Sequence, residues 1–94
     1  MRFEWDPRKA KANVRLHGVS FDEARTVFSD LRGRVQFDAL HSDFEDRFIQ
    51  LGRSSGDSLL LVWHCYRGDN IRIISARRAS IEDEIDYLKG DWNA

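Results

Sequence analysis

The chain has 94 residues, 41% of them hydrophobic and 12% aromatic, and a formal net charge of −1 at pH 7. That length supports one folded core, so we expect one domain over residues 1–94. No run approaches the ~20 apolar residues of a membrane helix. The first residues lack the apolar stretch of a secretory signal, and the one cysteine, Cys65, excludes an internal disulfide. We therefore expect a cytoplasmic protein that does not associate with membranes.

The charged residues are unevenly distributed along the chain. Residues 1–78 carry 14 Lys and Arg against 11 Asp and Glu, whereas residues 79–94 carry one Lys against five acids. Twelve of the 15 basic residues are arginine, whose planar guanidinium pairs well with phosphate or carboxylate. A basic body of this kind either binds a polyanion locally or is a solvated surface, and composition leaves both interpretations open.

A short strand, "RFEW", precedes two predicted helices. The first helix begins with Asp6 as its cap and Pro7 at its first position, and it ends shortly before Gly18. The second helix follows at once and runs from Ser20 to about Asp30, because its apolar residues recur at helical spacing. Two helices near the start of the chain are therefore expected.

Four strands and a last helix follow. The predicted strands are "RVQFDAL" (34–40), "DRFIQLGRS" (46–54), "SLLLVWHCY" (58–66) and "NIRIISA" (70–76). Short turns between them predict antiparallel pairing. Ser80 caps the last helix, which ends at Gly90 and is expected to bury Ile81, Ile85 and Leu88. The fold class is α+β: two N-terminal helices and one C-terminal helix packed on one small antiparallel sheet.

Three stretches together resemble one known family. They are "FEWDPRKAKANVRLHGVSFDEARTVFSD", "HSDFEDRFIQLGRS" and "GDNIRIISARRAS". From Phe3 to about Tyr87 the chain is similar to the BrnT family of toxins from bacterial type II toxin–antitoxin pairs. The resemblance implies a RelE-like fold and an endoribonuclease that cleaves RNA without a metal or other cofactor, inhibiting translation. It also implies neutralisation by a BrnA-type antitoxin, with operator DNA contacted only through the antitoxin complex.

The chain departs from the family pattern at three places. Leu16 precedes the "HG" pair where the family often has lysine, and "CYRG" (65–68) stands where "TERG" is common. Acidic residues 82–84 occupy the first turn of the last helix, which is usually basic. The last two departures favour an alternative, a non-catalytic module that binds the antitoxin or a nucleic acid.

Five residues are candidates for the catalytic site. RNA cleavage without a metal needs an acid, a base and cations that stabilise the phosphate. Arg77 and Arg78 are the predicted phosphate clamp, because a turn before the last helix brings both toward one edge; pairing with internal acids is the alternative. Arg47 with Glu45 is either an anchor and base or a surface ion pair. His41, in a loop, is either an acid or base or a locally bonded turn residue.

Four further residues are candidates for binding RNA. Arg72 is expected to make an outer contact, and Lys9 and Lys11 either follow the RNA backbone or form a solvated helix face. His17 is either an RNA contact or a structural residue, because an imidazolium favours a helix C-terminus. Trp63, on the most apolar strand, is interpreted as a core residue rather than a surface for base stacking.

Overall fold

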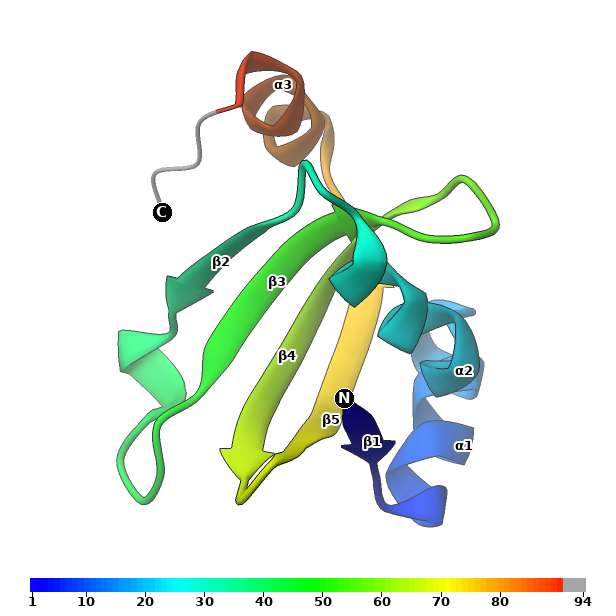
Figure 1. Ribbon diagram of the computed structural model, residues 1–94. Helices are drawn as coiled ribbons and strands as arrows, with labels where there is room; N and C mark the ends of the chain where they lie inside the picture. Colours follow the sequence, from blue (N-terminus) through cyan, green and yellow to red (C-terminus); the bar gives the residue numbers. More distant parts are fainter. Residues whose placement is uncertain (91–94) are drawn as a thin grey trace.

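The computed structural model describes residues 1–90, which form five strands on one sheet with helices on both of its faces (Figure 1). The elements are β1 (Arg2–Glu4), α1 (Pro7–His17), α2 (Phe21–Ala24), the 3-10 helix η1 (Arg25–Ser29), β2 (Arg34–Phe37), the 3-10 helix η2 (Ala39–His41), β3 (Phe48–Arg53), β4 (Leu59–Arg67), β5 (Asn70–Arg78) and α3 (Ile81–Lys89). The strand order is β1-β5-β4-β3-β2. The α+β class is confirmed.

β1 makes the sheet mixed. It pairs in parallel with β5, with Phe3 opposite Ile71, so the prediction of a purely antiparallel sheet is wrong. The pairs β2–β3, β3–β4 and β4–β5 are antiparallel, as their short connections require. The difference arises because β1 is followed by helices rather than by a hairpin, and a long connection allows neighbouring strands to run in the same direction.

Both ends of α1 lie at the predicted caps, whereas the second predicted helix is a short α-helix followed by a 3-10 helix. The Asp6 carboxylate accepts a hydrogen bond from the Arg8 amide at 2.8 Å, and Gly18 ends α1 with a φ of 67°. α2 has only 4 residues before the chain tightens into η1. The Thr26 hydroxyl donates to the Glu23 carbonyl at 2.6 Å, and a side chain bonded in this way competes with the regular helical ladder.

One face of the sheet packs against α1, α2 and η1, and we call it the closed face. Its core joins four residues from the chain around the helices to four residues of β4 and β5. These are Val19, Phe21, Ala24, Val27, Leu60, Val62, Ile73 and Ala76. All eight are at most 2% exposed, so this face supplies most of the apolar burial that stabilises the fold.

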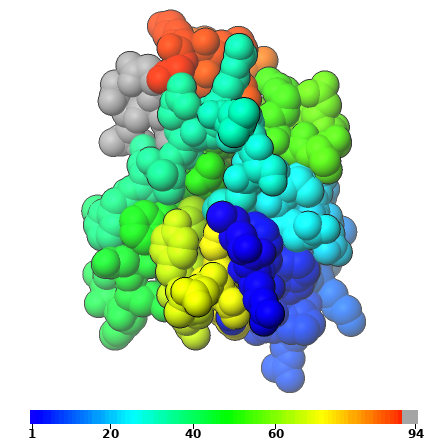
Figure 2. Space-filling view, viewed as in Figure 1, coloured from blue at the N-terminus to red at the C-terminus, as the bar shows by residue number. Residues whose placement is uncertain are grey.

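The opposite face, which we call the open face, is covered by α3 at one end only. Its buried cluster is Leu51, Leu61 and Tyr87. Helices therefore lie on both faces of the sheet, an arrangement that the sequence did not specify. Figure 2 shows α3 (orange-red) against the segment before β2 (teal), where the Tyr87 hydroxyl donates to Asp30 Oδ2 at 2.6 Å. This hydrogen bond links α3 to the rest of the molecule.

The predicted buried stripe of α3 is wrong. Ile81, Ile85 and Leu88 are 79%, 46% and 65% exposed, and Tyr87 is the residue that α3 buries. The reason is that burying a tyrosine needs a partner for its hydroxyl, and Asp30 supplies one from a distant part of the chain. Among residues 1–90, no helix is long and apolar enough to cross a membrane.

Candidate active site

β5 contains one residue more than the part of β4 that it pairs with. Trp63 pairs with Ser75 and His64 with Ile73, which leaves Ile74 as an extra residue. This is a β-bulge, a feature that commonly redirects a side chain near a functional site.

The bulge decides which side chains of β5 face the helices. Ile73 and Ala76 both lie in the core of the closed face although they are three positions apart. Ser75 and Arg77 therefore point to the open face. Strict alternation from Ile73 would have turned Arg77 toward the helices, so the bulge is what brings this arginine to the other side of the sheet.

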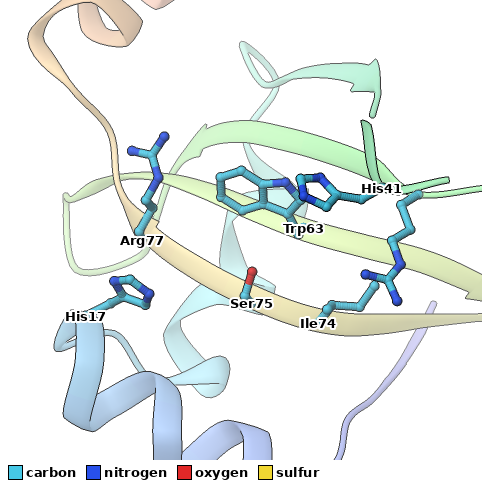
Figure 3. A pocket seen from close by; sticks show the side chains of 7 residues that line it. His17, His41, Trp63, Ile74, Ser75 and Arg77 are labelled. Atoms are coloured by element: carbon cyan, nitrogen blue, oxygen red, sulfur yellow. The ribbon is translucent and has the colours of Figure 1, made fainter. Parts of the chain in front are cut away.

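A pocket of about 320 Å³ opens on the open face, beyond the part that α3 covers. It is lined by His17, His41, Arg47, Trp63, Ile74, Ser75 and Arg77. Figure 3 shows His17 and Arg77 on one side of the pocket, Trp63 and Ser75 in the middle, and His41 and Ile74 toward the other side. Four predicted site residues, from four separate parts of the chain, are thus brought together.

His41 is held by a carboxylate that sequence reasoning missed. Its Nδ1 lies 2.7 Å from Asp38 Oδ2, with the Asp38 side chain 6% exposed and the His41 side chain 59% exposed. Because Nδ1 is engaged, Nε2 is the nitrogen available to a substrate. The spacing of Asp38 and His41, three residues apart in "DALH", was the available signal, but many loops contain such a pair.

The loop between β2 and β3 fixes His41 relative to Arg47. The Asp38 amide donates to the Arg47 carbonyl at 2.8 Å. The Ser42 hydroxyl donates to the Asp38 carbonyl at 2.6 Å and accepts from the Arg47 amide at 2.9 Å. These bonds hold a histidine and an arginine at the same pocket although neither lies in a strand.

Arg77 and Trp63 meet inside the pocket. The Arg77 guanidinium lies over the indole, 5.4 Å from the ring centroid, which is within the range of a cation–π contact. Arg77 Nη1 also donates to the Arg78 carbonyl at 3.2 Å. The interpretation of Trp63 as a core residue is wrong in part, because its ring packs against the buried cluster and also lines the pocket.

Asn13, another residue that sequence reasoning missed, fixes the side of the pocket that carries His17 and Arg77. It is 4% exposed, and its Nδ2 donates to the Val19 carbonyl at 2.9 Å and to the Ala76 carbonyl at 2.8 Å. Its Oδ1 accepts from the Ala76 amide at 3.1 Å. One side chain therefore holds the chain just after His17 and just before Arg77.

Arg78 is not in the pocket. β5 continues through Arg78 rather than ending before the arginine pair, so neighbouring side chains alternate and Arg78 turns away from Arg77. Arg78 Nη1 lies 3.4 Å from Ser58 Oγ. The expected geometry, in which a turn directs both arginines to one phosphate, is therefore wrong.

Glu45 is also outside the pocket and pairs with a different arginine. Its Oε2 lies 3.3 Å from Arg67 Nε, rather than against Arg47. The hydrogen bond from Arg67 is the main reason that the pKa of Glu45 lies below its ordinary value. A carboxyl that is stabilised as an anion is a weaker base, so this environment does not suit proton abstraction.

The remaining predicted RNA contacts lie away from the pocket. Arg72 Nη1 binds Glu4 Oε2 at 2.6 Å, and Asn70 donates to the same carboxylate at 3.0 Å. Hydrogen bonds from Asn70 and then Arg72 lower the pKa of Glu4. Lys9 and Lys11 are exposed on α1 and do not line this pocket.

The ionisable groups that line the pocket are two imidazoles and two guanidiniums. Within the described part of the chain, no three His, Cys, Asp or Glu side chains gather as metal ligands would. The arrangement offers proton transfer by histidine and stabilisation of negative charge by arginine at one place.

Comparison with known proteins places this architecture in a family. The family model described as ribonuclease toxin, BrnT, of type II toxin-antitoxin system matches residues 5–83. The crystal structure of the ribonuclease toxin BrnT from Brucella abortus matches with a TM-score of 0.63 and 24% identity, covering 85% of this chain and 97% of that chain, which shows a shared fold. No curated protein matches the chain. The chain therefore belongs to the BrnT family of ribonuclease toxins of type II toxin–antitoxin systems.

Proposed function

We propose that this protein is a metal-independent endoribonuclease that inhibits translation by cutting RNA. The reaction is attack of a ribose 2′-oxygen on the neighbouring phosphorus, with loss of the 5′-oxygen of the next nucleotide and formation of a 2′,3′-cyclic phosphate. The observation that supports it is the convergence of His17, His41, Arg47 and Arg77 on one open pocket.

His41 is the proposed general base. Its Nε2 accepts the proton of the 2′-hydroxyl as the oxygen attacks phosphorus. The buried Asp38 carboxylate, 2.7 Å from Nδ1, stabilises the imidazolium that forms and keeps the ring oriented. A base that is positioned in this way typically contributes about 10²- to 10⁴-fold to the rate.

His17 is the proposed general acid. It is the last residue of α1 and lines the pocket on the side that also carries Arg77. It donates its proton to the leaving 5′-oxygen, so His41 ends the step protonated and His17 neutral. Exchange with water restores both. The sequence left His17 between an RNA contact and a structural residue, and the pocket favours a functional role.

Arg47 and Arg77 are the proposed phosphate contacts. Charge accumulates on the non-bridging oxygens as the 2′-oxygen attacks, and a fixed guanidinium stabilises this charge by hydrogen bonding as well as by its own charge. Lys9 and Lys11, exposed on α1, extend the basic surface from the His17 end of the pocket along the RNA backbone. Arg72 is a weaker candidate, because Glu4 already binds it.

The proposed partner is a BrnA-type antitoxin. Membership of a type II toxin–antitoxin family implies an antitoxin, and its simplest means of inhibition is to cover the pocket. Operator DNA would be contacted only through the complex. RNA as the substrate implies that the toxin acts in the cytoplasm.

The test is cleavage of single-stranded RNA by the purified protein in the presence of EDTA. We expect products with 2′,3′-cyclic phosphate ends, and a loss of at least about 10²-fold in Arg77→Ala and in His41→Ala. Arg78→Ala is the matched control, because it removes the neighbouring arginine from the other face of the sheet. Absence of cleavage by the folded protein would favour the non-catalytic binding module, and an equal loss in Arg78→Ala would contradict the site.

A further inference from the structure

Trp63 is exposed to an unusual degree for its place in the sheet. It lies on β4, whose neighbouring residues Leu61, Val62 and Cys65 are at most 3% exposed. Trp63 is only half-buried, and Figure 3 shows its ring in the middle of the pocket. An indole with part of its surface open to a pocket retains apolar area that a ligand is able to cover.

The groups around the indole match the parts of a nucleotide. Arg77 places a cation 5.4 Å from the ring centroid, where it is able to bind a phosphate beside anything that lies on the ring. Ser75, the strand partner of Trp63, supplies a hydroxyl that donates or accepts hydrogen bonds, and Ile74 supplies an apolar side. An aromatic surface next to a cation and a polar group is the pattern by which proteins bind unpaired nucleotides.

The bulge in β5 is the reason that Ser75 and Arg77 lie beside Trp63. Because Ile74 is the extra residue, Ser75 and Arg77 both face the side of the sheet that carries Trp63. Without the bulge, Arg77 would share a face with Ile73 in the closed core. The same local irregularity therefore brings the phosphate contact to the aromatic ring, which argues that the two act on one ligand.

We propose that Trp63 is a stacking platform for one unpaired nucleobase of the RNA, next to the phosphate held by Arg77. This inference rests on the proposed ribonuclease function and defines its substrate class, which is RNA in single-stranded regions. A base within a duplex is stacked on both sides and is not free to lie on the indole, whereas a base in a loop or a single strand is. Selectivity for unpaired RNA thus follows from Trp63 rather than from the acid and base.

The first test measures binding without cleavage. Tryptophan fluorescence is recorded for His41→Ala in a background of Trp5→Phe and Trp92→Phe, with excitation selective for tryptophan, so that the emission comes from Trp63 alone. Addition of a single-stranded RNA oligonucleotide is expected to quench this emission, and the same sequence in a duplex is expected to quench it much less. Equal quenching by both, or none by either, would overturn the platform. Because quenching reports binding, this test gives an answer whether or not the protein cleaves RNA.

The second test is kinetic and uses substitutions of graded size. Stacking of one base is worth about 1–3 kcal/mol, so Trp63→Leu is expected to lower kcat/KM by about 5- to 150-fold, with Trp63→Phe in between. A substrate with an abasic nucleotide at the stacked position is expected to be cut equally slowly by the wild type and by Trp63→Leu. Trp5→Phe is the matched control, because Trp5 packs against Phe21 on the closed face.

The outcomes separate this inference from the proposed function. Cleavage that is unaffected by Trp63→Leu and by the abasic nucleotide would overturn the platform and leave the ribonuclease intact. Absence of any cleavage would contradict the ribonuclease, while the quenching experiment would still decide the platform. If Trp63→Leu fails to fold, the comparison of normal and abasic substrates on the wild type gives the answer.

Discussion

The two faces of the sheet differ in how they use the same strands. On the closed face, eight buried hydrophobic residues join the helices to β4 and β5. On the open face, the buried cluster has only three residues, and the surface beyond it forms a pocket that contains two histidines and two arginines. The core that stabilises the fold therefore lies mainly on one face of the sheet, and the proposed active site lies on the other.

In β5, consecutive residues belong to the stabilising core and to the pocket. Ala76 is 1% exposed in the closed core, while Arg77, the next residue, lines the pocket. The histidines follow the same division: His64 is fully buried on the closed face, whereas His41 is exposed and bonded to Asp38 on the open face. A substitution should therefore affect mainly stability or mainly activity, according to the face on which it lies.

The largest effect on stability is expected in the closed core. Leu60→Ala removes a side chain that is 0% exposed, and the resulting cavity is expected to lower the free energy of unfolding by about 2–5 kcal/mol. Ile74→Ala, at the half-buried pocket, is the matched control and is expected to cost less than about 1.5 kcal/mol. Urea denaturation followed by circular dichroism measures both. Equal losses would mean that the open face is as tightly packed as the closed one.

The second prediction concerns Asn13, which ties the backbone of β5 to the end of α1. Asn13→Ala leaves the Val19 carbonyl and both backbone groups of Ala76 without their partner, and we expect a loss of about 2–3 kcal/mol in the free energy of unfolding. Asn70→Ala, whose amide binds Glu4 at the half-buried sheet edge, is expected to cost about 1 kcal/mol or less.

Asn13→Ala should also reduce cleavage of RNA under conditions in which the variant is fully folded. The reason is that Ala76 precedes Arg77, so a loosened backbone displaces the guanidinium from its place over Trp63. Activity assays well below the unfolding midpoint measure this effect. Full activity in a destabilised variant would show that Asn13 stabilises the fold without positioning the pocket.

Local signals in the sequence predicted the ends of the helices well. The caps at Asp6, Ser20 and Ser80 and the left-handed Gly18 and Gly90 are all present. Each of these depends on a few neighbouring residues, so no knowledge of the tertiary structure is needed. The hairpin strands were predicted for the same reason, from turn residues that lie between apolar runs.

The features that the sequence did not predict depend on contacts between distant residues. The bulge at Ile74 follows from the pairing of β5 with β4, and the burial of Tyr87 follows from Asp30, 57 residues away. Asn13 likewise acts on Ala76, 63 positions along the chain. The candidate residues His41, Arg47, Arg77 and His17 were identified, but the bulge that excludes Arg78 was not visible in the pattern.

The last prediction concerns His64, a titratable group within the closed face. Its ring packs against Phe28, Phe48 and Tyr66, with centroid distances of 4.8, 6.0 and 5.5 Å. Nδ1 lies 3.2 Å from the Val62 carbonyl, and Nε2 has no hydrogen-bond partner within residues 1–90. Burial is the main reason that the pKa of His64 lies below its ordinary value of 6.5.

A lowered pKa makes stability depend on pH in a defined direction. Below pH 6.5 the unfolded chain binds a proton at His64 more readily than the folded protein does, so the free energy of unfolding falls as the pH falls. From about pH 7.5 to about pH 5.5 this one group is expected to remove at most about 1.4 kcal/mol. His64→Phe, which fills the aromatic cluster without a titratable ring, should lose this component while His41→Ala keeps it. Urea denaturation at a series of pH values measures the free energy of unfolding of both proteins. If its pH dependence is the same for the wild type and for His64→Phe, the closed face accepts a charged imidazole. The closed face would then not differ from the open face in excluding charge at this residue.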